Sequence, residues 1–557
     1  AIAYLVRRLD ENTSPENFLP HVFSMTPGDP EWQEQEERFR EACQRIDSAA
    51  SKPNRQQNRA LPPQPAGSDF RNSPDTDWVL PANRQWLAEE IQNFQPDSPP
   101  SCPKLEEVLQ IAKSSEWSQT APAKRADLLY RVADQLEAAR GRLIAVMRHE
   151  AEKRPFEADD EISEAADFAN YYGKHISTEG FLDGSTPTPL GTIVITPPWN
   201  FPCAIPCGGI LAALAAGNSV IIKPAPETVL TAWEMVKCLW QAGIPRDALQ
   251  FFPCPDNEIG QGLITAPEVH GVILTGASET AELFKSWRPD LALFAETSGK
   301  NTLIITDTAD SDLAIKDLVH SAFGHAGQKC SAASLALIEA NLYDSPRLLD
   351  QLRDAAASLH VGPADDPATI VTPLISEPSP HLLRGLTQLD DGESWLLEPR
   401  QLGPTLWSPG IRLGVKPGSW IHRTELFGPV LSIIRIESLE EGLQIQNSSD
   451  FGLTGGIHSL DPDEISHWRE QVEVGNAYIN RAITGAIVQR QPFGGWKRSS
   501  VGPGAKAGGP NYLTQFSTWE EDALPQHQAE PSSKVNQLLE SFPKDDRLLA
   551  AARNYAY

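Results

Sequence analysis

The sequence has too few cysteines for a disulfide framework. Seven cysteines are spread over 557 residues, and an odd number at irregular spacing is unlike the paired pattern of secreted domains. Cys203 and Cys207 are four residues apart, but no second pair of candidate ligands lies near them in the sequence. A zinc site is therefore not expected, and neither is any other metal site. We expect a reducing, cytoplasmic setting.

Basic charge is scarce as well. The chain has 47 Lys and Arg against 74 Asp and Glu, a formal net charge of -27 at pH 7. Modules that bind nucleic acid usually carry a basic face, because neutralising phosphates supplies much of their affinity. The charge therefore disfavours a nucleic-acid partner, including the function of a DNA-binding regulator.

Long apolar runs are also missing. The most apolar stretch, residues 203–222, is interrupted by a proline, three glycines and an asparagine. A helix that spans a membrane needs about 20 mostly apolar residues in a row. This stretch is predicted to be buried core and not a membrane span. The start of the sequence has no charged-then-apolar leader, so a secretory signal is not expected.

The chain is too long for one hydrophobic core, and its pattern predicts two lobes. From Gly191, short β-branched runs alternate with helical stretches, which is typical of a doubly wound parallel sheet. A second set of alternating strands and helices runs from Asn301 to about Gly475. A helix-rich segment over 104–172 precedes both sets. We therefore predict an α/β fold with two doubly wound lobes.

Four short blocks contain residue types suited to aldehyde chemistry. They are PPWNFP with Trp199 and Asn200, FAETSGKN with Glu296, GHAGQKCSA with Cys330, and ELFGPV with Glu425 and Phe427. In this order and near this spacing, the blocks resemble the aldehyde dehydrogenase superfamily over roughly residues 104–520. The resemblance implies the aldehyde dehydrogenase fold, with a small strand flap near Thr514–Glu520 through which such proteins self-associate.

Oxidation of an aldehyde by hydride loss requires a tetrahedral adduct first, and a thiolate is a strong nucleophile for forming it. Cys330 is predicted to be that nucleophile, at a helix start that would lower its pKa. By resemblance, the Asn200 amide and the Cys330 N–H stabilise the oxyanion, and Glu296 activates water to hydrolyse the thioester. Taken alone, the cysteine could be a packed core residue, the glutamate a surface charge and the asparagine a turn cap.

The sequence has no GxGxxG fingerprint, so the cofactor site is inferred from the resemblance. The pyrophosphate is expected at the helix that follows Gly276 and begins at Ser278, because helix N-termini favour anions. Lys223 is expected at the adenosine ribose, where the family often has a glutamate three residues later and this chain has Pro226. Glu425, Phe427 and Trp199 are expected at the nicotinamide end. NAD is predicted in preference to NADP.

The stretch ITGAIVQRQPFGGWKRSSVGPGAKAGGPNYL, residues 483–513, resembles the C-terminal signature of 1-pyrroline-5-carboxylate dehydrogenases. That resemblance implies that the N–H groups of Gly485 and Ala486 bind the α-carboxylate of glutamate γ-semialdehyde. It also assigns Ser331 to that carboxylate and Phe493, in the QPFGG core, to the substrate site. Glu157 is expected near the substrate amine. The alternatives are a dehydrogenase for another small aldehyde, a cofactor-free esterase and an inactive scaffold.

The segment AYLVRRLDENTSPENFL resembles the last barrel helix of the proline dehydrogenase domain in bifunctional proline utilization A enzymes. By that resemblance Arg7 and Arg8 bind a carboxylate, although a pair on a helix surface is the simpler interpretation. The barrel and its FAD would lie upstream of this chain, so the partners expected are that domain and further copies of the chain. The predicted divisions are 1–25 barrel remnant, 26–103 linker with a helix over 31–47, 104–296 NAD-binding domain, 297–480 catalytic domain, 481–524 anchor loop and flap, and 525–557 tail.

Overall fold

The computed structural model describes residues 2–14, 17–21, 24–48, 53, 55–62, 70–177, 185–521, 534 and 537. It contains two compact units, residues 1–58 and 59–557, each described by itself. Nearly all of the predicted tail, 525–557, lies outside the described residues. None of the helices in the described part of the chain combines the length and apolar character needed to cross a bilayer.

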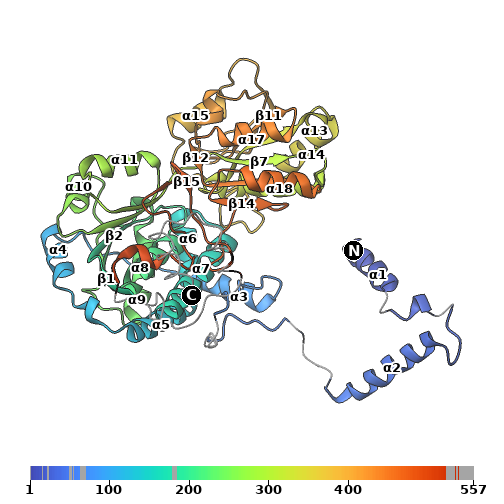
Figure 1. Cartoon of the computed structure of the whole chain (residues 1–557), viewed down its shortest axis with the longest axis horizontal. Coiled ribbons are helices and arrows are strands. Elements are labelled where there is room, and N and C mark those ends of the chain that lie inside the picture. Colours follow the sequence, from blue (N-terminus) through green and yellow to red (C-terminus); the bar gives the residue numbers. More distant parts are fainter. Residues whose placement is uncertain are drawn as a thin grey trace. The chain divides into compact units, whose positions relative to one another are not determined.

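The first unit contains helices α1 (Ile2–Thr13) and α2 (Pro30–Gln44) (Figure 1). The Asp29 side chain accepts the Trp32 N–H at 2.7 Å and so begins α2, and proline follows at the first helical position. No residue of α2 is buried. The helix predicted over 31–47 is confirmed, with its end slightly earlier.

The second unit begins with a helical layer that confirms the helix-rich segment predicted over 104–172. Its helices are α3 (Pro81–Asn93), α4 (Leu105–Ser114), α5 (Pro122–Ala138), α6 (Arg140–Ala151) and α7 (Pro155–Ser177). Helix α3 was not predicted. The segment before it is held on α7, where Asp167 accepts the Ser73 N–H at 2.6 Å and Asp159 accepts the Thr76 N–H at 2.6 Å.

The first lobe is built on a six-stranded sheet in the order β16-β6-β5-β2-β3-β4. Its strands are β2 (Thr192–Thr196), β3 (Ser219–Ile222), β4 (Leu249–Phe251), β5 (Gly271–Thr275), β6 (Leu293–Glu296) and β16 (Ser500–Val501), and all but β16 pair in parallel. Ile193 and Ile195 point into a core shared with α5, α7, α8 (Ala204–Ala215) and α9 (Val229–Gln241). Val194 points the other way, into a core shared with α4, α10 (Glu258–Thr265) and α11 (Ser278–Trp287). The sheet is therefore doubly wound, as predicted (Figure 1).

The second lobe is built on a seven-stranded sheet in the order β14-β13-β7-β8-β11-β10-β9. Its strands are β7 (Asn301–Ile305), β8 (Ala333–Glu339), β9 (Ser394–Leu397), β10 (Gly410–Leu413), β11 (Val430–Ile436), β13 (Thr454–His458) and β14 (Asn476–Ile479). Only β9 is antiparallel to its neighbour. The flanking helices include α12 (Ser311–Phe323), α14 (Pro346–Ala357), α17 (Leu439–Asn447) and α18 (Pro462–Gln471).

Two short ribbons complete the second unit. Strand β1 (Ser185–Pro189) pairs antiparallel with β17 (Ser517–Glu521), at the place predicted for the flap. Strand β12 (Phe451–Gly452) pairs with β15 (Trp496–Lys497). The chain passes from the first sheet to the second between Glu296 and Asn301, so the ETSGKN block lies where the two lobes join.

Candidate active site

Cys330 lies in a turn that ends where strand β8 begins, at Ala333. The prediction of a helix start at the nucleophile is wrong, because the residues before it form a tight reversal and not the approach to a helix. His325 and Ala326 have φ angles of 52° and 53°, and Gly327 has a φ of 70°. A Cβ on Gly327 would lie 2.4 Å from the Gly428 carbonyl oxygen, so only glycine fits there. Among the described residues, no helix begins at Cys330, so no helix N-terminus there lowers the pKa of the thiol.

The surroundings of Cys330 favour the neutral thiol. Burial raises the pKa of Cys330 to about 12, and the nearby carboxylates of Glu425 and Glu296 add to the effect. Burial also raises the pKa of Glu296 to about 8, although Oε2 of that carboxylate accepts the Gly495 N–H at 2.7 Å. The thiol and a basic carboxylate are thus brought together, and the proton lost by one can be taken by the other.

The predicted oxyanion donors meet at the Cys330 turn. The Asn200 side-chain amide donates to the Gln328 carbonyl oxygen at 2.9 Å, two residues before the nucleophile. Within the described part of the chain, the Cys330 N–H donates to no other residue. Asn301, which sequence reasoning missed, fixes the turn by donating to the Cys330 carbonyl oxygen at 2.6 Å and to that of Ala332 at 3.0 Å.

A buried ion pair fixes the backbone of the segment that contains Asn200. Lys153 and Glu161 are at most 1% exposed, and the Lys153 ammonium contacts the Glu161 carboxylate. The same ammonium donates to the Asn200 carbonyl oxygen at 2.8 Å. The other Glu161 oxygen accepts the N–H groups of Cys203 at 2.9 Å and Ala204 at 3.0 Å, at the start of α8. Sequence reasoning missed this pair, because no local sequence pattern connects Lys153 and Glu161 to the Asn200 segment, which lies more than 35 residues further along the chain.

The residues predicted for the pyrophosphate end lie beside Glu296. The Gly276 N–H donates to the Glu296 carbonyl oxygen at 3.1 Å, and helix α11 begins at Ser278 as predicted. The Ser278 N–H donates to the Ser298 hydroxyl at 3.2 Å. A helix N-terminus with this orientation can bind a phosphate group.

The residues predicted for the nicotinamide end also gather near Cys330. Glu425 Oε1 accepts the Gly299 N–H at 3.0 Å, and burial raises the pKa of this carboxylate. The rings of Trp199 and Phe427 meet edge to face with centroids 5.8 Å apart. The ELFGPV block is also the turn that enters strand β11.

Lys223 leaves strand β3 at a distinct subsite. Its side chain is 10% exposed, and its ammonium forms an ion pair with Asp256, just before α10. Pro226 begins a short 3-10 helix, η4 (Pro226–Thr228), and offers no hydrogen-bonding side chain. Together with Gly276 and Glu425, these residues fit a dinucleotide. Lys223 provides a nearly buried cation, Gly276 lies just before an anion-binding helix end, and Glu425 provides a carboxylate in addition to that of Asp256.

The loop predicted to bind the substrate carboxylate is connected to Cys330 through Tyr478. The Tyr478 hydroxyl donates to the Gly485 carbonyl oxygen at 3.0 Å, and Tyr478 lies close enough to interact electrostatically with Cys330. Within the described residues, the N–H groups of Gly485 and Ala486 donate to no other group. Gly485 has a φ of 90°, a backbone conformation that residues other than glycine rarely adopt.

Charged residues form ion pairs next to Cys330. Glu157 pairs with Lys329 at 2.7 Å and with Arg154 at 3.1 Å. Burial alone would raise the pKa of Glu157, but these two cations lower it well below its ordinary value. Ser331 is buried beside Cys330. Sequence reasoning missed Lys329, although its position next to the nucleophile could have indicated it.

Phe493 is half-buried and forms two backbone hydrogen bonds of 3.0 Å with Ala507. It directly precedes the Gly494–Gly495 turn that contacts Glu296.

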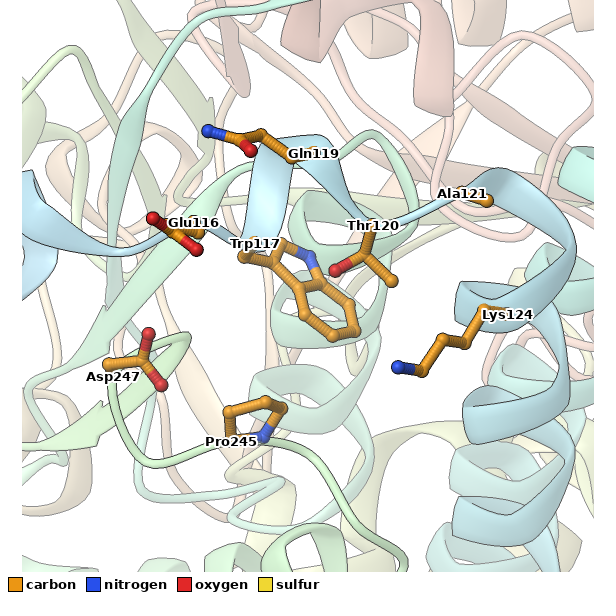
Figure 2. A pocket seen from close by; sticks show the side chains of 8 residues that line it. All are labelled: Glu116, Trp117, Gln119, Thr120, Ala121, Lys124, Pro245 and Asp247. Atoms are coloured by element: carbon orange, nitrogen blue, oxygen red, sulfur yellow. The ribbon is translucent and has the colours of Figure 1, made fainter.

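A surface cavity of about 400 Å³ lies elsewhere, around Trp117, Lys124 and Asp247 (Figure 2). None of its lining residues belongs to the predicted site, so its size does not mark the active centre.

Comparison with known proteins shows the family of the chain. The aldehyde dehydrogenase family matches residues 103–521, and the chain belongs to that family. It is 31% identical over 502 residues to the 1-pyrroline-5-carboxylate dehydrogenase of Geobacillus kaustophilus strain HTA426, which covers 80% of this chain and 97% of the relative. The corresponding protein of Bacillus cereus strain ATCC 10987 is 33% identical over 467 residues, which covers 78% of this chain and 87% of the relative.

Solved structures of two kinds are similar to the chain. Proline utilization A from Corynebacterium freiburgense has 46% identity and a TM-score of 0.83, over 97% of this chain and 53% of that one. The 1-pyrroline-5-carboxylate dehydrogenase from Thermus with bound NAD has 29% identity and a TM-score of 0.73, over 82% of this chain and 98% of that one. The chain thus spans about half the length of that proline utilization A protein.

Proposed function

We propose that the chain oxidises L-glutamate γ-semialdehyde, the open form of 1-pyrroline-5-carboxylate, to L-glutamate with NAD. The observation that carries the proposal is the pair of N–H groups at Gly485 and Ala486, which donate to no other group within the described residues. They lie on a loop connected through Tyr478 to Cys330. Such N–H groups suit a carboxylate. A plain aliphatic aldehyde would have no use for this anchor. The relatives named above as 1-pyrroline-5-carboxylate dehydrogenases support the same substrate.

The charges around the nucleophile suit the two ends of an amino acid. The α-carboxylate would be bound by the anchor-loop N–H groups, the Ser331 hydroxyl and the Lys329 ammonium. The α-ammonium would face Glu157, which remains ionised because Lys329 and Arg154 lower its pKa. Phe493 would line the wall between them. An inactive scaffold would need none of these groups, and an esterase would not need Glu425 or Phe427.

The reaction would begin when Glu296 takes the proton of the Cys330 thiol. The thiolate attacks the aldehyde carbon, and the Asn200 amide with the Cys330 N–H stabilises the oxyanion of the adduct. The chemistry that bound NAD would supply is an acceptor for the hydride that leaves this carbon. Glu296 then releases the thiol proton to solvent and, ionised again, deprotonates the water that hydrolyses the remaining thioester. That second proton passes to the departing Cys330 sulfur, so the thiol and the carboxylate are both restored.

The cofactor would be held by residues of both lobes. Gly276 and Ser278 would bind the pyrophosphate, and Lys223 the adenosine ribose. Glu425 would hold the nicotinamide ribose, with Phe427 and Trp199 at the ring. This assigns residues 104–296 mainly to cofactor binding and 297–480 to the nucleophile. The bound NAD of the Thermus relative supports the choice of cofactor.

A proline dehydrogenase domain that carries FAD is the expected partner, either fused or separate. The proline utilization A neighbours support this inference. In this structure Arg7 and Arg8 both pair with Glu11, at 3.0 and 2.9 Å, and all three are exposed. The β1–β17 ribbon would join copies of the chain into an oligomer.

The test is NADH formation, followed by absorbance, with glutamate γ-semialdehyde and with pentanal, which has the same chain length but no amino acid group. We expect turnover of the semialdehyde that is lost in Cys330→Ser and kept in Cys102→Ser, which replaces an exposed cysteine. Gly485→Ala should raise KM for the semialdehyde about tenfold or more, because a Cβ strains this backbone conformation. It should leave pentanal oxidation nearly unchanged.

Gly418→Ala is the matched control for the anchor loop. Gly418 also has a positive φ, 81°, and open space where a Cβ would stand, but it is not part of the site. Equal turnover of both aldehydes, or equal effects of the two glycine substitutions, would contradict the assigned substrate. Loss of activity in Cys102→Ser as well as Cys330→Ser would contradict the assigned nucleophile.

A further inference from the structure

The ribose subsite contains a carboxylate that the sequence pattern does not indicate. The Lys223 side chain is nearly buried, while the Asp256 side chain paired with it is 65% exposed. Asp256 directly precedes Asn257, whose side chain caps α10 by accepting the Ile259 N–H at 2.9 Å. The Asn257 cap fixes the backbone next to Asp256. The Asp256 carboxylate therefore faces solvent beside the Lys223 ammonium.

The usual position for a discriminating acid is not available here. Pro226, three residues after Lys223, cannot hydrogen bond through its side chain. The next residue, Glu227, is exposed. Among the described residues, Asp256 is the carboxylate that pairs with Lys223.

We propose that Asp256 makes the site selective for NAD by occupying the place that the 2′-phosphate of NADP would need. This inference rests on the proposed function. A carboxylate accepts a hydrogen bond from a ribose hydroxyl, as acidic residues do in other dinucleotide sites, and it repels a phosphate. Asp256 also neutralises Lys223, the cation that a 2′-phosphate would otherwise pair with. The selectivity thus comes from the residue that precedes the N-cap of α10 and not from the segment after β3.

The test is the equilibrium affinity of the whole chain for NAD and for NADP, measured by calorimetry without aldehyde. In Asp256→Asn, which keeps the size of the side chain, we expect NADP to bind about tenfold tighter or more. NAD affinity should change by less than about threefold, because the amide can still accept a hydrogen bond. Glu227→Gln is the matched control and should leave both affinities unchanged.

Two results would overturn the inference. One is an unchanged ratio of NADP to NAD affinity in Asp256→Asn, and the other is a gain in NADP affinity in Glu227→Gln. A wild-type chain that binds neither dinucleotide would contradict both this inference and the proposed function. The expected shift in affinities together with no oxidation of any aldehyde would support Asp256 and contradict the proposed function alone.

Discussion

Cys330 and Glu296 are both held in their neutral forms by burial. A thiol with a pKa of about 12 is almost entirely protonated near neutrality, and a carboxyl with a pKa of about 8 is largely protonated. Each anion disfavours the other, since Glu296 is one cause of the raised pKa of Cys330. The nucleophile therefore becomes reactive by proton transfer to the fraction of Glu296 that is ionised, and not through a stable thiolate.

The pH dependence of turnover should report Glu296. A general base must be unprotonated, so we expect kcat to rise with pH between about 7 and 9. Glu296→Gln should lower kcat by about 100-fold or more and remove this rise. Steady-state NADH formation across pH measures both effects.

Glu150→Gln is the control for the pH dependence. Glu150 is another carboxyl whose pKa is raised by burial, but it accepts the N–H groups of Leu230 and Thr231 at the start of α9. The rise with pH should persist in this variant. A rise that also persists in Glu296→Gln would show that another group acts as the base.

At the scale of the element, hydrophobic patterning predicted most of the fold. The strands over Thr192–Thr196 and Asn301–Ile305 are β-branched runs buried on both faces, a pattern that only a sheet covered on both sides explains. Helix α3 was missed because it is mostly polar and buries only Asn83 and Leu87. The helix predicted at Cys330 was wrong because the reversal at 325–327 depends on left-handed backbone angles.

The chemical residues could be predicted only where they lie in recognisable blocks. Asn200, Glu296 and Cys330 were predicted in this way, and the structure brings all three to one turn or its surroundings. Lys153 and Asp256 were not predicted, because each contacts a partner that is distant in sequence, Asn200 and Lys223 respectively. Such contacts follow from the packing of helices on the sheet and leave no local pattern.

The Lys153–Glu161 pair should be necessary for both stability and the placement of Asn200. Lys153→Met leaves an unpaired buried carboxylate, so we expect a loss of about 3–5 kcal/mol in the free energy of unfolding. It also removes the donor to the Asn200 carbonyl oxygen, so kcat should fall. Thermal denaturation and NADH formation measure the two effects.

The double variant with Glu161→Gln separates the two roles. It removes the uncompensated charge while the amide oxygen can still cap α8, so most of the lost stability should return. The kcat should remain low, because the donor to Asn200 is still missing. Arg353→Ala, which breaks an exposed pair with Asp350, is the control and should cost less than about 1 kcal/mol. Full recovery of kcat in the double variant would contradict a positioning role for Lys153.

At the scale of the whole molecule, the two units differ in how much apolar surface they bury. In the described part of residues 1–58, Leu9 is 63% exposed, Phe39 is 70% exposed and Ile46 is 67% exposed. In residues 59–557, three large apolar clusters fill the two lobes. Because apolar burial is the main favourable contribution to folding, stability should reside almost entirely in the second unit.

Two truncations test where the stabilising part of the chain begins. Removal of residues 1–58 should leave NADH formation intact and change the melting temperature by less than about 2 °C, because little apolar surface is lost. Removal of residues 1–80 should clearly lower the melting temperature. Asp159 and Asp167 are buried and would lose the N–H donors of Thr76 and Ser73. Each such loss costs about 1–3 kcal/mol. Equal melting temperatures for the two truncations would mean that residues 59–80 contribute no stability, whereas a large loss on removing 1–58 would place stabilising contacts in the first unit.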